Sequence, residues 1–128
     1  MNLDQISVPC TSLETSVAFY RRLGLRLIVS APPAYARFEC PVGGSTFSLH
    51  LVDAPPAEPG VLVYFEVDDV DARVRELEAA GIRFETAPVD QPWLWREAWL
   101  RDPAGNRLCL FHAGENRLDP PWRLAEGA

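Results

Sequence analysis

Two stretches of this 128-residue chain carry the same pattern of apolar residues, and this internal repeat constrains the fold more than any other feature. The first stretch runs from Ser7 to Leu27, and the second runs from Tyr64 to Phe84. At an offset of 57 positions their apolar residues coincide without a gap, and Gly24 matches Gly81. Few residues are identical, so the repeat indicates a duplicated structural unit.

Each copy begins as a strand and continues as a helix. Apolar and polar residues alternate in Gln5–Cys10 and in Leu62–Val67, which is typical of a strand with one face in a core. Apolar residues then recur at helical spacing. The residues expected to cap these helices are, at the N-termini, Ser12 and Asp68 or Asp69 and, at the C-termini, Gly24 and Gly81.

Three further strands are expected in each copy. They are Leu25–Val29, Tyr35–Cys40 and Thr46–Val52 in the first copy, and Ile82–Thr86, Glu97–Arg101 and Arg107–Phe111 in the second. The sequence therefore predicts an α+β fold made of two tandem βαβββ modules. We expect one domain over residues 1–113, with modules at about 1–53 and 61–113, a proline-rich linker between them, and an irregular tail over 114–128.

Composition excludes several functions. The formal net charge is −6, which disfavours nucleic acid as a partner because no basic surface displaces counterions from phosphates. Lysine is absent, so Schiff-base catalysis by a lysine amine is impossible. No apolar run is long enough for a membrane span, and the acidic N-terminus does not resemble a signal peptide. With three cysteines at no metal-binding spacing, a cytoplasmic chain with reduced thiols is expected.

Three motifs in this order resemble the vicinal oxygen chelate superfamily, which includes glyoxalases, bleomycin-resistance proteins and extradiol dioxygenases. They are Leu13–Gly24 in the first helix, Val67–Asp71 at the start of the second helix, and Arg96–Asn106 in the last hairpin. The resemblance implies that the modules form a U-shaped mixed sheet that cups a small molecule, with the helices outside. It also implies a homodimer, because exposed sheet edges invite pairing and some members of the family exchange modules.

The resemblance implies four positions for the ligands of a divalent metal. They fall on Gln5, Ser48 (or His50 after a small register shift), Leu62 and Cys109. Leu62 has no ligating atom, so no metal and no other cofactor is expected. The alternative is a reduced site of Gln5, His50 and Cys109 with water, which would suit zinc best.

Strand alternation predicts which side chains line the cup. Phe47, Leu49 and Leu51 should face the core. The side chains expected in the cup, with Trp95 from the preceding loop, are Gln5, Arg37, Ser48, His50, Tyr64, Trp95, Trp99, Cys109 and Phe111. Trp93 and Trp95 either stack on a planar ligand at the rim or fill a dimer interface; the sequence leaves both open.

Two side chains are candidates for catalysis. His50 could serve as a general base with Glu97 or Glu66 as its partner, although a lone strand histidine is more often structural. Cys109 is more often an inert buried thiol than a nucleophile.

The sequence thus predicts a small-molecule-binding protein of the glyoxalase and bleomycin-resistance type, without a complete metal site. The ligand would be a drug-like or metabolic compound. The aromatic lining of the cup favours a planar ligand, and the acidic chain favours a partly cationic one. Whether the protein is an enzyme stays open. The alternative is a divergent metal-dependent glyoxalase-like lyase or isomerase, or a dioxygenase.

Overall fold

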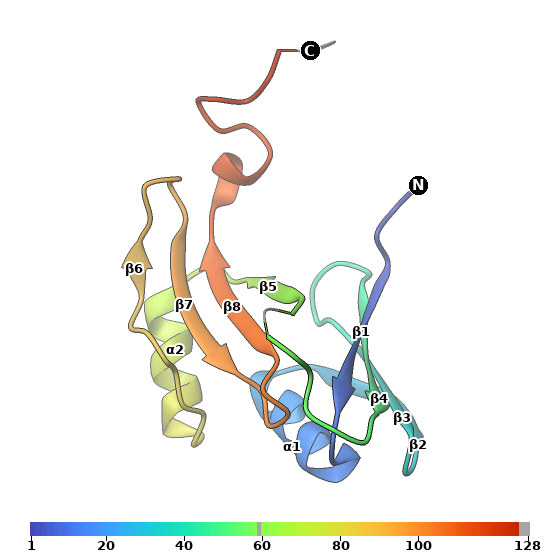
Figure 1. Cartoon of the computed structure of the whole chain (residues 1–128). Helices are drawn as coiled ribbons and strands as arrows, with labels where there is room; N and C mark the ends of the chain where they lie inside the picture. Colours follow the sequence, from blue (N-terminus) through green and yellow to red (C-terminus); the bar gives the residue numbers. More distant parts are fainter. Residues whose placement is uncertain (59, 126–128) are drawn as a thin grey trace.

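The computed structural model describes residues 1–58 and 60–125, and it contains two βαβββ modules in tandem (Figure 1). The first module comprises β1 (Gln5–Cys10), α1 (Leu13–Leu23), β2 (Arg26–Ala31), β3 (Tyr35–Glu39) and β4 (Thr46–Leu51). The second comprises β5 (Leu62–Glu66), α2 (Val70–Ala79), β6 (Val89–Asp90), β7 (Arg96–Arg101) and β8 (Arg107–His112). The predicted α+β class with two tandem modules is confirmed.

The two helices begin where the sequence predicts. The Ser12 side chain accepts a hydrogen bond from the Thr15 amide, and the Asp69 side chain accepts one from the Ala72 amide. Each bond satisfies an amide that a helix start would otherwise leave unpaired. Gly24 ends α1 with a φ of 114°, a left-handed conformation that favours glycine.

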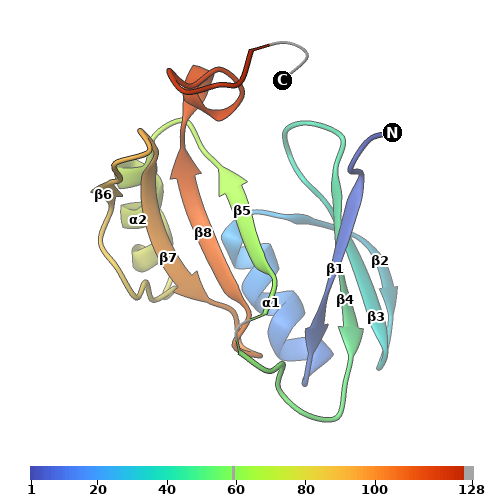
Figure 2. The ribbon, with the colours of Figure 1, turned by 45° about the horizontal axis from the view of Figure 1, so that its top comes forward.

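Each module forms its own four-stranded sheet. The strand orders are β1-β4-β3-β2 and β5-β8-β7-β6, so the two sheets have the same topology. The first strand of each module runs parallel to the last, and the other pairs are antiparallel. In both sheets the first strand pairs on one side only, which leaves β1 and β5 as edges (Figure 2).

Several predicted details were wrong. The expected strand at Ile82–Thr86 reduces to an isolated bridge between Phe84 and Leu100, because the amides of Glu85 and Thr86 both donate to one carbonyl, that of Trp99. Leu51 is 40% exposed because it lies at the end of β4, beyond the core. The tail, for which an irregular conformation was expected over 114–128, contains one 3₁₀ turn, η1 (Gly114–Arg117), and its residues 126–128 lie outside the described part of the chain.

One hydrophobic core joins the two modules. It contains Tyr20, Phe38, Phe47 and Leu49 from the first module together with Val63, Leu100 and Leu108 from the second. The rings of Phe47 and Phe65 pack across the junction with centroids 5.8 Å apart. Helix α1 lies between the two sheets, and α2 packs on β7 and β8 (Figures 1 and 2).

A buried hydrogen-bond network centres on Asp102, in the turn between β7 and β8. Its carboxylate accepts from the Tyr20 hydroxyl of α1 at 2.6 Å and from the Asn106 side-chain amide at 2.7 Å. It also accepts from the backbone amides of Ala104 and Asn106. Asn106 in turn donates to the Pro9 carbonyl of β1 at 2.8 Å. The last turn of the second module is therefore bound to two elements of the first.

None of the helices in residues 1–58 and 60–125 combines the length and the apolarity needed to cross a membrane.

Replacing Asp102 by alanine should lower the free energy of unfolding by roughly 2–4 kcal/mol, because the buried Tyr20 hydroxyl and Asn106 amide lose their acceptor. Urea denaturation measures this change. The control is Asp90→Ala, which removes an exposed carboxylate and should change stability by less than about 0.5 kcal/mol. Equal effects of the two substitutions would contradict the role assigned to the network.

The same network predicts a loss of stability in alkali. Burial, and then the neighbouring Asp102 carboxylate, raise the pKa of the Tyr20 phenol far above its ordinary value. Above about pH 10 the unfolded chain loses the phenol proton while the folded chain keeps it, so stability should fall by up to about 1.4 kcal/mol per pH unit from this group. In Tyr20→Phe the free energy of unfolding should fall less steeply over the same range. Parallel slopes for the two proteins would show that Tyr20 does not contribute.

Candidate functional site

Four aromatic side chains cluster on the face of the second sheet that lies opposite its core. The Tyr64 ring meets the rings of Trp95, Trp99 and Phe111 edge to face, with centroids 5.5–5.9 Å apart. Trp95 stacks on Phe111 at 4.6 Å with an interplanar angle of 18°. These are the preferred geometries of aromatic pairs. Tyr64 is nevertheless 41% exposed, so the cluster presents aromatic surface to solvent. We call these four residues the aromatic cluster.

Two buried polar groups lie at the base of the aromatic cluster. The Glu97 carboxylate accepts hydrogen bonds from the indoles of Trp93 at 2.7 Å and Trp99 at 3.1 Å, one on each oxygen. Beside it, burial raises the pKa of the Cys109 thiol to about 12, and the Glu97 charge adds to this shift. Cys109 is therefore a protonated thiol at neutral pH, which makes it a poor nucleophile. Glu97 fixes the orientation of two tryptophans.

The loop before β7 contains a strained residue. Leu94 has a φ of 68°, a left-handed conformation that is uncommon for a residue with a Cβ. It separates Trp93 from Trp95, so that one indole reaches Glu97 while the other stacks on Phe111. Strain of this kind often accompanies functional loops.

The corresponding face of the first sheet is polar. Ser7, Ser48 and Arg37 lie side by side on β1, β4 and β3. His50 and Tyr35 form the adjacent row. The Ser7 hydroxyl and the His50 Nδ1 atom are 2.8 Å apart, and Arg37 Nε donates to the Tyr35 hydroxyl at 3.0 Å. Gln5 lies at the end of β1, where its side-chain oxygen accepts from Thr46 at 2.7 Å. We call these six residues, Gln5, Ser7, Tyr35, Arg37, Ser48 and His50, the polar face.

The polar face and the aromatic cluster occupy equivalent positions in the repeat. At the offset of the repeat, Ser7 corresponds to Tyr64, and the strand registers then match Ser48 to Cys109 and Arg37 to Trp99. His50 likewise matches Phe111. The duplicated sheet therefore carries polar side chains in one copy and aromatic or apolar side chains in the other.

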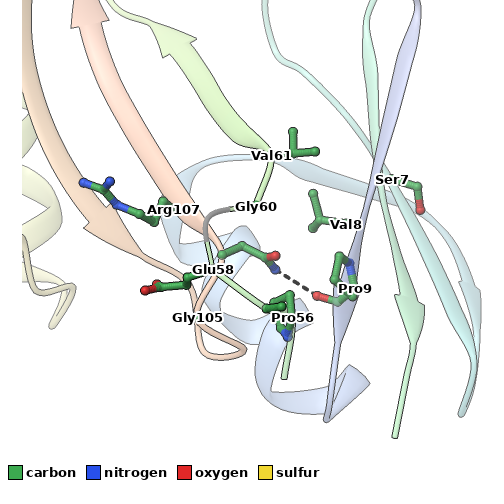
Figure 3. A pocket seen from close by; sticks show the side chains of 11 residues that line it. Ser7, Val8, Pro9, Pro56, Glu58, Gly60, Val61, Gly105 and Arg107 are labelled. Atoms are coloured by element: carbon green, nitrogen blue, oxygen red, sulfur yellow. Dashed lines mark hydrogen bonds between the residues drawn. The ribbon is translucent and has the colours of Figure 1, made fainter. Parts of the chain in front are cut away.

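Within one chain these two surfaces point away from each other, except that Gln5, at the end of β1, reaches the edge of the aromatic cluster. Val8, a core residue, points toward the second module, whereas Ser7 points to the opposite side of β1 (Figure 3). Arg107, whose guanidinium lies 4.7 Å from the Trp99 ring, points away from the first module (Figure 3). The structure brings Tyr64, Trp95, Trp99, Cys109 and Phe111 together, as predicted. It does not bring His50 and Trp99 into one pocket of a single chain, because the shared core separates their faces.

A groove of about 820 Å³ runs between the two edge strands, β1 and β5. Gln5 and Thr46 from the first module line it, and so do Tyr64, Trp95 and Phe111 from the aromatic cluster. Its volume is in the range of small-molecule sites, which is about 300–1,000 Å³. This groove is where Gln5 and the aromatic cluster share a cavity.

A second cavity lies at the module junction, lined by the linker around Pro56 and by Val8, Pro9 and Arg107 (Figure 3). Its volume of about 210 Å³ is below that range, and the hydrogen bond from Asn106 to Pro9 crosses it. We assign it to the packing of the modules.

The residues at the implied metal positions do not fit a divalent ion. Leu62 offers no ligating atom, Cys109 is fully buried, and the Gln5 oxygen accepts from Thr46. Among residues 1–58 and 60–125, no three His, Cys, Asp or Glu side chains are grouped to hold a metal ion. His50 lies on the polar face, whereas Cys109 lies on the face of the second sheet that points away from it, so the reduced set of Gln5, His50 and Cys109 does not converge in one chain.

Within one chain His50 meets neither of its predicted partners, Glu97 and Glu66. Its hydrogen bond is to Ser7, while Glu97 holds the two indoles. Glu66 accepts from the amides of Ala113 and Gly114 and pairs with Arg117 in the tail. Sequence reasoning also missed Ser7 and Tyr35. The sequence contained the signal for both. Ser7 lies two positions from Gln5, and Tyr35 lies two positions from Arg37, so each shares a strand face with a predicted cup residue.

Solved structures of similar proteins share this fold. A glyoxalase/bleomycin resistance protein/dioxygenase from Nocardioides is 28% identical, with a TM-score of 0.79 over 98% of this chain and 90% of that chain. A lactoylglutathione lyase from Agrobacterium tumefaciens is 24% identical, with a TM-score of 0.72 over 87% and 92%. A bleomycin-binding protein complexed with bleomycin is 22% identical, with a TM-score of 0.72 over 89% and 99%. No curated protein matches closely enough in sequence to count as a relative.

The family model of the glyoxalase/bleomycin resistance protein/dioxygenase superfamily matches residues 2–110. The match covers both modules, including the two helix motifs and the last hairpin. The chain therefore belongs to the glyoxalase/bleomycin resistance protein/dioxygenase superfamily.

Proposed function

We propose that this protein binds a planar small molecule in an aromatic-lined cup, without a metal ion. The observation that carries the proposal is the aromatic cluster, in which Tyr64 remains 41% exposed although three other rings pack around it. An ordered, solvent-facing group of rings offers stacking surface at little entropic cost. Bleomycin bound to a protein of the same fold is consistent with such a ligand.

The cup is composite in this proposal, because each chain supplies only half of it. The polar face of one copy covers the aromatic cluster of a second copy, and the reverse contact forms a second, identical cup. Two features support this arrangement: the faces point away from each other in one chain, and β1 and β5 each have an unpaired edge. A two-fold dimer repeats the same contact twice, as closed symmetry requires.

The alternative function is catalysis by a divergent lyase, isomerase or dioxygenase. One observation favours it: the Ser7 hydroxyl holds His50 Nδ1 at 2.8 Å, which would orient the ring as a general base. Leu62, which has no ligating atom, counts against the metal-dependent forms of this chemistry. Binding is therefore the function that the residues support best.

Purified protein should contain less than one divalent ion per chain, and a chelator should leave the melting temperature unchanged. The reason is that Leu62 and Cys109 occupy two of the four implied ligand positions. Elemental analysis measures the metal content per chain, and thermal denaturation with and without EDTA measures the change in melting temperature. One tightly held ion per chain, with a clear loss of stability on chelation, would contradict the proposal and favour the alternative function.

The protein should sediment as a dimer at micromolar concentration. Because the dimer covers the aromatic cluster, Tyr64→Arg should shift the equilibrium toward monomer, while Glu78→Arg, on the exposed side of α2 and outside both surfaces, should not. Sedimentation velocity measures the fraction of dimer for the unmodified protein and for each variant. A stable monomer in the unmodified protein would contradict the composite cup.

A further inference from the structure

We propose that the polar face binds the carboxylate of an aromatic acid, with Arg37 as its main contact, while the ring of the acid stacks on the aromatic cluster of the second copy. This inference rests on the composite cup proposed above and adds the chemical class of the ligand. It replaces the expectation of a partly cationic ligand, which considered only the net charge of the whole chain.

The first observation concerns the charge of Arg37. The chain has 18 acidic residues against 12 arginines, yet no carboxylate among the described residues lies within ion-pair distance of the Arg37 guanidinium. Its Nε atom donates to Tyr35, and the remaining N–H groups make no hydrogen bond in that part of the chain. Arg37 is on β3, between β2 and β4, and is partly buried, so the sheet holds its position. A free guanidinium fork matches a carboxylate in geometry and in charge.

The second observation is independent of charge. Ser48, directly opposite Arg37 on β4, is completely buried; its hydroxyl lies near the Tyr35 phenol but has no partner in hydrogen-bonding geometry. A buried hydroxyl without a partner costs free energy, and in native structures it calls for an explanation. Alternation along β4 turns Ser48 away from the core, toward the side of Arg37 and Tyr35. A ligand carboxylate that reaches this row would accept from both residues.

Tyr35 completes the polar environment. The hydrogen bond from Arg37, and then the nearby hydroxyl of Ser48, lower the pKa of the Tyr35 phenol, which indicates a surrounding that favours negative charge on oxygen. The Arg37 guanidinium also lies 5.6 Å from the centre of the Tyr35 ring. The same surrounding would favour a bound carboxylate.

The repeat then explains why the ligand needs a ring as well as an acid group. Arg37 and Trp99 occupy equivalent positions of the two sheets. In a cup built from both sheets, the Arg37 guanidinium would therefore lie on one wall and the Trp99 indole on the opposite wall. The Glu97 carboxylate accepts a hydrogen bond from the Trp99 indole, and the centroid of the Tyr64 ring lies 5.5 Å from that of the Trp99 ring. A flat acid would use both halves of such a cup at once.

The test uses three probes that share one ring system: 2-naphthoate, the neutral 2-naphthamide and the cationic 2-naphthylmethylammonium. Binding to the full chain is followed by titration calorimetry at low ionic strength. We expect 2-naphthoate to bind at least 10-fold more tightly than the other two. Arg37→Gln should remove this preference by weakening 2-naphthoate roughly 10- to 100-fold, the scale of a lost charge-assisted hydrogen bond. Arg22→Gln, which removes the same charge from the exposed side of α1, should change nothing.

The outcomes separate the two proposals. Equal binding of the three probes, or a preference for the cation, would overturn the carboxylate inference while leaving a planar-ligand cup in place. Binding of none of the three would overturn the inference and the proposed function together. A preference for 2-naphthoate that survives Arg37→Gln would place the acid elsewhere and also overturn the inference.

A complementation experiment tests whether the two halves come from different copies. Arg37→Gln and Trp99→Ala chains are co-expressed with different tags, and the heterodimer is isolated. A composite cup predicts that one of its two sites combines the intact Arg37 of one copy with the intact Trp99 of the other, so tight 2-naphthoate binding should return at one site per dimer. If no tight site returns, both halves belong to one chain and the proposed cup is wrong.

Discussion

The buried hydrogen bond between Tyr20 and Asp102 determines how the two modules of this protein are joined. It links the centre of α1 to the turn between β7 and β8, and Asn106 extends the link to β1. Because the bond lies inside the shared core, α1 is held between the two sheets. The helix-free face of each sheet then has to point outward, and both halves of the proposed cup result from that constraint.

The duplication gives the chain two sheets of one topology and two different chemistries. The common core contains the apolar residues Phe47 and Leu49 of one module and Leu108 and Leu110 of the other. The opposite faces lie outside this core, so equivalent positions could diverge into arginine and serine in one module and tryptophan and cysteine in the other. A polar half and an aromatic half are complementary only when they meet, which is why the second copy enters the proposed function.

The chemistry of the site follows from burial more than from residue type. Cys109 is a potential ligand and nucleophile in the sequence, but burial beside Glu97 keeps its thiol protonated. Glu97 is a potential base, but two indole N–H groups occupy its oxygens. Arg37 shows the opposite effect, because it lies on a sheet face where no described acidic side chain reaches it. The surroundings therefore favour recognition through Arg37 and the aromatic cluster.

The sequence by itself determined the modules, the helix caps and the side of each strand on which Trp99, Phe111 and Ser48 lie. These features depend on local periodicity and on caps, which neighbouring residues settle. Periodicity could not tell that Glu85 and Thr86 share one carbonyl, so the strand predicted there was wrong. Only the tertiary structure decided that His50 bonds to Ser7 and that the polar and aromatic faces point apart. Those relations depend on how α1 packs between two sheets that are distant in sequence, and alternation along a single strand carries no information about that packing.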